Sequence, residues 1–314
     1  LVRARRTTGV DTATPSRLAE RAEKARAKGE PLPVSIKIGT HPADVIAGTY
    51  KAAAGVSEIG ISGGMRGAPV ALTPCRTNEV PCIADAEIVL EGFVEPGNTR
   101  DEGPLGEWTG FFGSKVNNAP VIDVKAIYHR NDPILFSCPP QRPPGENSRV
   151  RAVMRSALLR EEIAKAGVPD IKGVWCHEVG GTRMFIAVSL TTRYPGHSVQ
   201  AGHVAAQCGS GAYAGKYVVV VDDDVDPANL EEVVWAMALR SDPATSINII
   251  HGARSTPLDP SIPPWEKAKG NYTNSRAIID ACKPFHWKDE FPPVNSPSPE
   301  TMPEAVEKWA YLCE

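Results

Sequence analysis

The pattern of apolar and polar positions changes near residue 137 and divides the chain into two parts. Before that point, we expect a helix at 16–29, which ends at Gly29, a strand at 33–39 and a short helix that begins at Pro42. From Ser57 to about Leu135 the pattern is one of short strands between turn residues. Several strands at this spacing favour a closed or sandwiched sheet, that is, a β-barrel-like core. The clearest strands are expected at 68–75, 85–94, 119–130 and 132–136.

A proline-rich stretch, SCPPQRPPGENS at 137–148, is the best candidate for a domain boundary. Beyond it strands and helices alternate, which indicates a second domain of the α/β class. A further proline-rich tail precedes one short helix at 304–314, which we interpret as an arm that docks on a neighbouring subunit. The second domain is expected to have helices at 149–167, 197–208 and 227–240 and strands at 171–179, 183–192, 216–222 and 246–252.

Composition and charge narrow the class of protein. The 314 residues are 42% hydrophobic and 23% charged with a formal net charge of −3, as in an ordinary soluble protein, and nothing suggests nucleic acid or an anionic membrane as a partner. We expect no signal peptide and no membrane span, because no apolar run approaches the length needed. The seven cysteines contain no CxxC pair and are interpreted as reduced thiols of a cytoplasmic protein.

The stretch DEGPLGEWTG at 101–110 sets Glu102 and Glu107 five residues apart around a Gly-Pro-Leu-Gly core. In a helix this spacing separates two side chains by about 140°, and in a strand it places them on opposite faces. The glycines and proline therefore favour a turn that aims both carboxylates into one space. Carboxylates that share a pocket repel each other, and this raises one pKa and keeps one acid protonated near neutral pH. A solvated acidic surface turn is the alternative.

Two other stretches carry weaker signals. GISGGMRGAP at 60–69 is rich enough in glycine to approach a flavin or a phosphate, but it matches neither GxGxxG nor a Walker A loop. VDDDVD at 221–226 suits a cation, although we favour an N-cap for the helix that follows. The chain has no GxSxG and no HExxH, so nucleophilic or zinc-dependent hydrolysis has no support.

Taken together, these stretches resemble the UbiD family of decarboxylases, which use prenylated FMN. The segments that carry the resemblance are ADAEIVLEG at 84–92 followed by EGPLGEWTG at 102–110, and it extends over nearly the whole chain. It implies an α/β (α+β) fold with a split β-barrel-like, N-terminally incomplete cofactor domain at 1–137. An α/β oligomerisation domain at 147–290 and a tail with a docking helix at 291–314 would follow.

The resemblance also implies roles for individual residues. Glu102 would orient a catalytic arginine, and Glu107 would deliver a proton after CO2 leaves. Glu58 would bind Mn2+ or Mg2+ against the flavin phosphate, with K+ as a further candidate ion. Positions expected to contact the cofactor are Thr49 and Tyr50, and positions expected to shape the substrate pocket are Trp108, Thr256 and Leu258.

The chain departs from the family in one respect. Members carry an N-x-G-x-x-R segment that supplies a metal-binding Asn and the catalytic Arg, and by position it would precede residue 1. We favour a fragment of a longer protein, since the first residue is Leu; a separate subunit that supplies the segment, or loss of the cofactor, are the alternatives.

The function expected from the resemblance is reversible, non-oxidative decarboxylation of an aromatic, heteroaromatic or α,β-unsaturated carboxylic acid. A flavin prenyltransferase would supply the cofactor, and the protein would form homodimers or hexamers. The alternative is a non-catalytic or half-site subunit of a split UbiD-like complex, and an FMN-binding oxidoreductase is a third, weaker option.

Overall fold

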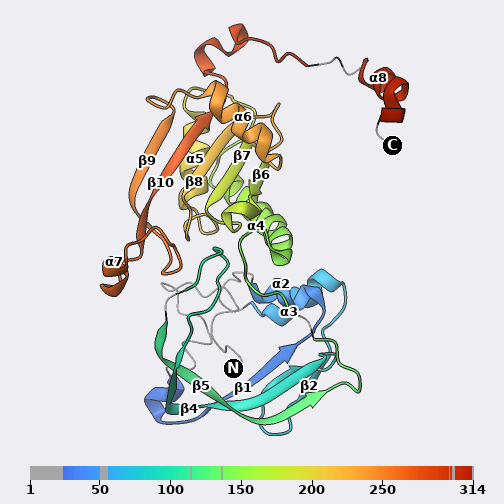
Figure 1. Ribbon diagram of the computed structural model, residues 1–314, viewed down its shortest axis with the longest axis vertical. Helices are drawn as coiled ribbons and strands as arrows, with labels where there is room; N and C mark the ends of the chain where they lie inside the picture. The colour runs from blue at the N-terminus through green and yellow to red at the C-terminus, as the bar shows by residue number, and fades with distance from the viewer. Residues whose placement is uncertain are drawn as a thin grey trace.

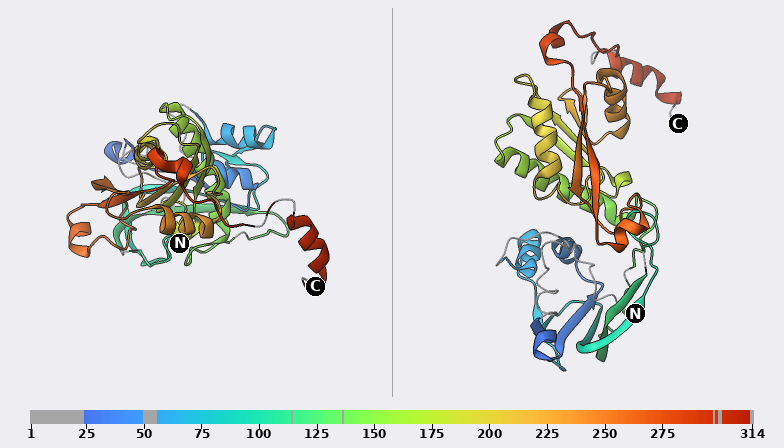
Figure 2. Two further views of the ribbon diagram at one scale, coloured as in Figure 1. Left: turned by 90° about the horizontal axis from the view of Figure 1, so that it is seen from above. Right: turned by 90° about the vertical axis from the view of Figure 1, so that its left-hand side faces the viewer.

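The computed structural model describes residues 24–49, 56–113, 115–135, 137–296, 298 and 301–312, without the side chains of Thr49 and Asn147. Two domains lie one above the other in Figure 1, joined by the connector that begins at residue 137. The C-terminal helix α8 lies apart from the body of the second domain (Figures 1 and 2). Within the described part of the chain, no helix is long and apolar enough to cross a membrane.

The first domain is built on an antiparallel sheet of order β1-β4-β5, accompanied by the two-stranded hairpin β2-β3 and the helices α2 and α3. The long strand β4 occupies the centre and pairs with β1 on one side and β5 on the other. The elements are β1 (Leu32–Ile38), α2 (Pro42–Thr49), α3 (Glu58–Arg66), β2 (Leu72–Pro74), β3 (Pro81–Ile83), β4 (Ile88–Glu102) and β5 (Val116–His129).

Three expectations for this domain are corrected. Residues 58–66 form the helix α3 and not a strand, and the described residues 132–135 are irregular. β4 continues to Glu102, beyond the expected end at 94, because its polar second half still pairs with β5. The described strands of this domain do not close into a barrel.

The second domain has a five-stranded mixed sheet of order β6-β7-β8-β10-β9. β7, β8 and β10 are parallel to one another, while β6 and β9 are antiparallel edge strands. Its elements are α4 (Glu146–Lys165), β6 (Ile171–Cys176), η1 (Glu178–Gly180), β7 (Phe185–Leu190), α5 (His197–Gln207), β8 (Tyr217–Asp222), α6 (Leu230–Arg240), β9 (Ile247–Arg254), α7 (Pro264–Ala268), β10 (Thr273–Ala281) and η2 (Phe285–Glu290). The tail carries α8 (Thr301–Trp309) and η3 (Ala310–Leu312).

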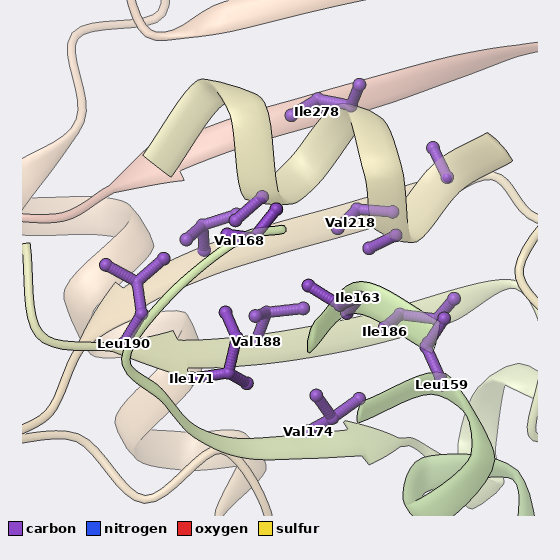
Figure 3. Close-up of a cluster of buried hydrophobic side chains, with 14 of the residues drawn as sticks. Leu159, Ile163, Val168, Ile171, Val174, Ile186, Val188, Leu190, Val218 and Ile278 are labelled. Carbon is purple, nitrogen blue, oxygen red and sulfur yellow. The ribbon is translucent and has the colours of Figure 1, made fainter. Parts of the chain in front are cut away.

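Both faces of this sheet are buried, which explains the continuous apolar run YVVVV in β8. Val218 and Val220 face a core built with α4 and α5 (Figure 3), while Val219 and Val221 face a second core built with α6. Gly202 of α5 lies against Ile278, where a side chain would collide, so this glycine brings the helix close to the sheet.

The mixed α/β fold expected from the sequence is confirmed. One strand was missed: β10 was not among the expected strands, yet it lies between β8 and β9 in the sheet. Its first half, Thr-Asn-Ser-Arg, is polar, and Arg276 is nevertheless buried there. Sequence pattern alone assigns such residues to a loop.

Candidate active site

Glu107 lies in a tight hairpin that follows β4. Gly106 pairs with Phe112 across it, and the amide of Glu107 donates to the carbonyl of Phe111 at 3.0 Å. The turn closes where the amide of Gly110 donates to the carbonyl of Glu107 at 2.9 Å. Gly110 has φ of +84°, a conformation that favours glycine. Glu102 is the last residue of β4 and Glu107 lies on the hairpin, so the tight turn follows Glu107, and a shared space for the two carboxylates stays a prediction.

The hairpin faces the second domain, and two glycines bring the domains into close contact. Trp108 lies against Gly181, where a side chain would collide with the indole ring. At the other end of the hairpin, an added Cβ on Gly113 would lie 3.1 Å from Cγ of Glu107 and 3.5 Å from Cδ2 of Leu258. The fold thus places Glu107 and Leu258 around one glycine, although 151 positions separate them in the sequence.

Thr256 belongs to the same region. It is fully buried, and its hydroxyl accepts a hydrogen bond from the hydroxyl of Tyr213 at 2.9 Å and one from the amide of Leu258 at 3.3 Å. Of the residues expected at the site, Glu107, Trp108, Thr256 and Leu258 therefore lie at one junction between the domains. Tyr213, which the sequence did not single out, belongs with them.

The loop that carries Thr256 and Leu258 is held by Asp259, whose side chain is completely buried. Its carboxylate accepts from Lys216 at 2.8 Å, from the hydroxyl of Ser255 at 2.9 Å and from the amide of Ser261 at 3.0 Å. Burial raises the pKa of Asp259, but the hydrogen bonds from Lys216 and Ser261 outweigh it and lower the pKa to about 2. The carboxylate is thus ionised at neutral pH and anchors the loop.

A second anchor is Arg276 of β10. Its buried guanidinium donates to the backbone carbonyls of Ala206, Gly211, Ala212 and Arg254. These carbonyls belong to the end of α5, to the loop between α5 and Tyr213, and to the end of β9, which leads to Thr256. Sequence reasoning missed Arg276 and Asp259 because an arginine in a polar stretch and an aspartate in a loop carry no pattern that distinguishes buried from exposed positions.

The residues expected to bind the cofactor and metal lie in the first domain. Glu58 is exposed and is the first residue of α3, after Ser57 at the N-cap. Thr49 ends α2, and Tyr50 lies outside the described residues. The structure does not test the expected roles of these residues, and they stay predictions.

Within the described ranges, a single group of three side chains has the spacing of a metal site: Cys75, Cys82 and Glu91. The carboxylate of Glu91 already accepts from the amides of Arg76 and Thr77 and from the hydroxyl of Thr77, at 2.7 to 3.1 Å. Burial raises the pKa of the Cys75 thiol to about 11. Because the oxygens of Glu91 already accept hydrogen bonds and the thiol of Cys75 is protonated, we interpret the group as a buried polar cluster and not as a metal site. The six cysteines that the structure describes form no disulfide.

Two of the four aspartates in the acidic stretch at 221–226, Asp222 and Asp224, form ion pairs within the fold. Arg240 contacts Asp222 at 3.3 Å and Asp224 at 2.8 Å, and Lys283 contacts Asp224 at 2.8 Å. The N-cap of α6 is Asn229, whose side chain accepts from the amides of Glu231 and Glu232, so the expectation that the aspartates cap this helix is wrong. Two hollows on the described part of the second domain, one along β6 and one at the start of α4, include neither Glu102 nor Glu107.

Comparison with known proteins gives two family matches that together span most of the chain. Residues 1–143 match the 3-octaprenyl-4-hydroxybenzoate carboxy-lyase Rift-related domain (UbiD), and residues 148–281 match the C-terminal domain of the same carboxy-lyase. The boundary between the two matches falls in the proline-rich connector.

Solved structures of similar fold come from the same class. The UbiD-class enzyme HmfF from Pelotomaculum thermopropionicum in complex with FMN is 30% identical, with a TM-score of 0.82 over 93% of this chain and 63% of that one. The apo 3,4-dihydroxybenzoic acid decarboxylase from Enterobacter cloacae is 28% identical, with a TM-score of 0.82 over 95% and 63%. An evolved dimeric form of HmfF in complex with prFMN is 28% identical, with a TM-score of 0.75 over 92% and 60%. The chain thus spans less than two thirds of the length of these proteins.

Proposed function

Because the chain belongs to the UbiD family of carboxy-lyases, we propose that the protein is a reversible, non-oxidative decarboxylase of an aromatic, heteroaromatic or α,β-unsaturated carboxylic acid. Prenylated FMN is the proposed cofactor, with Mn2+ or Mg2+ bound beside it and K+ as a further candidate. The similarity to enzymes solved with FMN and with prFMN supports a flavin.

The observation that carries this proposal is the position of Glu107. The hairpin presents its side chain beside Gly113 and Leu258, at the junction between the domains, and the next residue packs against Gly181. A carboxyl group held at the boundary between two domains can meet a substrate enclosed between them. An acidic turn on an open surface, the alternative interpretation of this stretch, makes no such contact with a second domain.

The residues of α3 fit a flavin and its metal. Gly60 and Gly64 are four residues apart and so share one face of the helix. An added Cβ at Gly64 would meet nothing within 4 Å, and one at Gly60 would meet only Ser57, at 3.8 Å, so this face leaves room for a ring or a phosphate. The carboxylate of Glu58 provides the oxygen ligand that Mn2+ and Mg2+ prefer. Thr49 and Tyr50 are proposed to contact the same cofactor.

The chemistry then divides between cofactor and protein. A bound prenylated flavin supplies an electron sink for the electron pair left by the departing CO2. Glu107 holds the proton that replaces the carboxylate on carbon, and Glu102, at the end of β4, orients the catalytic arginine of the family. Trp108, Thr256 and Leu258 enclose the substrate and exclude water from the site. In the reverse direction, Glu107 accepts the proton, and carboxylation requires high CO2.

For this decarboxylase we propose a cytoplasmic homo-oligomer, dimeric or hexameric, that receives its flavin from a prenyltransferase.

The test is to co-express the full-length protein with a flavin prenyltransferase, record its absorbance and native mass spectra, and then measure CO2 release from a panel of aromatic, heteroaromatic and unsaturated acids. Bound prenylated flavin with a divalent metal and CO2 release from at least one acid would support the decarboxylase. Flavin binding with NADH oxidation and no CO2 release would contradict it. A second chain that co-purifies and is required for turnover would contradict a homo-oligomer.

A further inference from the structure

A group of arginines lies behind Trp108 in the second domain. The guanidinium carbon of Arg183 lies 5.8 Å from the centre of the Trp108 ring and 5.1 Å from that of Tyr213. Arg254 lies over the same Tyr213 ring at 5.4 Å. Tyr213 is in turn hydrogen-bonded to Thr256, so these cations are in direct contact with residues of the proposed substrate site.

Two further arginines approach Arg183 from α4. Arg151 and Arg155 are four residues apart and therefore lie on one face of that helix. Their charges lower the pKa of Arg183, after burial, which is the largest cause. Burial likewise lowers the pKa values of Arg151 and Arg155. The three guanidinium groups are thus half-buried and repel one another.

Among the described residues, the carboxylate of Glu162 opposes the effect of burial on the pKa of Arg155, but no carboxylate does so for Arg183 or Arg151. Arg155 donates to the carbonyl of Ser210 at 2.6 Å, and the nearby carboxylate of Glu162 accepts from the amide and hydroxyl of Ser210. In the described ranges, neither Arg183 nor Arg151 forms an ion pair with a carboxylate. Half-buried cations without acidic partners are costly for a fold to maintain unless an anion occupies the site.

Arg149, on the same helix, differs from Arg183 because it forms an ion pair with a carboxylate. Its guanidinium also lies over an aromatic ring, that of Trp175 at 5.3 Å, but it pairs with Glu178 at 2.8 Å. The contact with an aromatic ring is therefore common to both arginines, and the missing carboxylate is what distinguishes Arg183.

We propose that Arg183, with Arg151 and Arg155 behind it, binds a second carboxylate of the substrate, so that the enzyme acts on an aromatic or heteroaromatic dicarboxylic acid. This inference rests on the proposed function. The cluster is not suited to the carboxylate that departs, because fixed cations around an ionised carboxylate stabilise the ground state and oppose the loss of CO2. A second carboxylate keeps its charge throughout the reaction. Cations that bind it stabilise the ground state and the transition state alike, so they do not oppose the loss of CO2.

The experiment compares binding of benzoate, benzene-1,4-dicarboxylate and 4-hydroxybenzoate by titration calorimetry. It uses the full-length, cofactor-loaded protein with the Glu107→Gln substitution, which prevents turnover. The dicarboxylate should bind about 10- to 100-fold more tightly than benzoate, as expected for charge-assisted hydrogen bonds. Arg183→Met should remove this preference, Arg183→Lys should keep part of it, and the control Arg149→Met should keep all of it.

Several results would overturn the inference: equal affinities for benzoate and the dicarboxylate, a preference that survives Arg183→Met, or 4-hydroxybenzoate binding as tightly as the dicarboxylate. If Arg183→Met does not fold, the salt dependence decides, because a preference for the dianion must weaken as NaCl rises. A preference that is independent of salt overturns the inference. Failure of the proposed function is seen separately, as no CO2 release from the wild-type protein although the preference for the dicarboxylate is intact.

Discussion

The indole of Trp108 lies directly against Gly181, so the first domain contacts the second at a position where only hydrogen fits as a side chain. Gly181 also has φ of +62°, which disfavours other residues. The contact places the residue next to Glu107 against the domain that carries Tyr213, Thr256 and Leu258. Together with the contact of Gly113 with Leu258, this close approach constrains the relative position of the two domains and hence the shape of the site.

Gly181→Ala should therefore displace Trp108. We expect the free energy of unfolding to fall by about 1–3 kcal/mol from overpacking and kcat/KM to fall about 10- to 100-fold from misplacement of the site. Gly252→Ala is the matched control, since its φ of +66° is similar but an added Cβ meets nothing within 4 Å. Equal effects of the two substitutions on kcat/KM would show that backbone conformation, and not the contact with Trp108, is responsible.

Glu107→Gln should abolish turnover and leave the fold intact, because the amide has nearly the shape of the acid but no proton of suitable acidity. A general acid contributes about 10²- to 10⁴-fold to the rate, so kcat should fall by at least this range. The exposed Glu79→Gln in the same domain is the control. Substantial remaining CO2 release by the Glu107 variant, at an unchanged melting temperature, would rule out its role as proton donor.

Asp259 should make stability depend on pH in the acid range. Its pKa of about 2 in the folded protein lies below the ordinary value of 3.8, so its contribution is complete above pH 3.8 and is lost as pH falls through 2. Asp259→Asn should lower the free energy of unfolding by about 2 kcal/mol at pH 7, and the difference from wild type should shrink as the pH approaches 2. Denaturant titrations at pH 7, 4 and 2.5 measure this difference.

The exposed Asp289→Asn serves as the control for that series and should change stability little at any of the three pH values. A difference between wild type and Asp259→Asn that stays constant from pH 7 to 2.5 would mean that the charge of Asp259 does not account for its effect. Because Asp259 holds the loop of Thr256 and Leu258, KM should also rise in this variant.

The tail helix α8 should contribute to assembly. Met302, Val306 and Trp309 lie on one face of the helix and are 46%, 63% and 47% exposed. A second copy of this chain is the partner that we expect to cover them. Replacing all three with Ser should reduce the assembly mass measured by light scattering, whereas Glu304→Gln, on another face, should not. An unchanged mass in the triple variant would exclude α8 from the interface.

The sequence by itself determined the family, the division at the proline-rich connector, and most helices and strands. These features are local: apolar periodicity, glycine and proline at turns, and short motifs specify them without reference to distant residues. The helix α3 was misjudged because its sequence, EIGISGGMR, contains three glycines, which are poor helix formers.

Only the tertiary structure decided which residues surround Glu107. Leu258, Thr256 and Tyr213 are more than 100 positions away in the sequence, and the domains bring them to the hairpin through Gly113 and Gly181. For the same reason, the sequence did not reveal that Asp259 and Arg276 anchor the site, or that arginines cluster at Arg183. A charged residue has the same appearance in a sequence whether it lies in water or beneath a loop, and its burial and partners are properties of the packed chain.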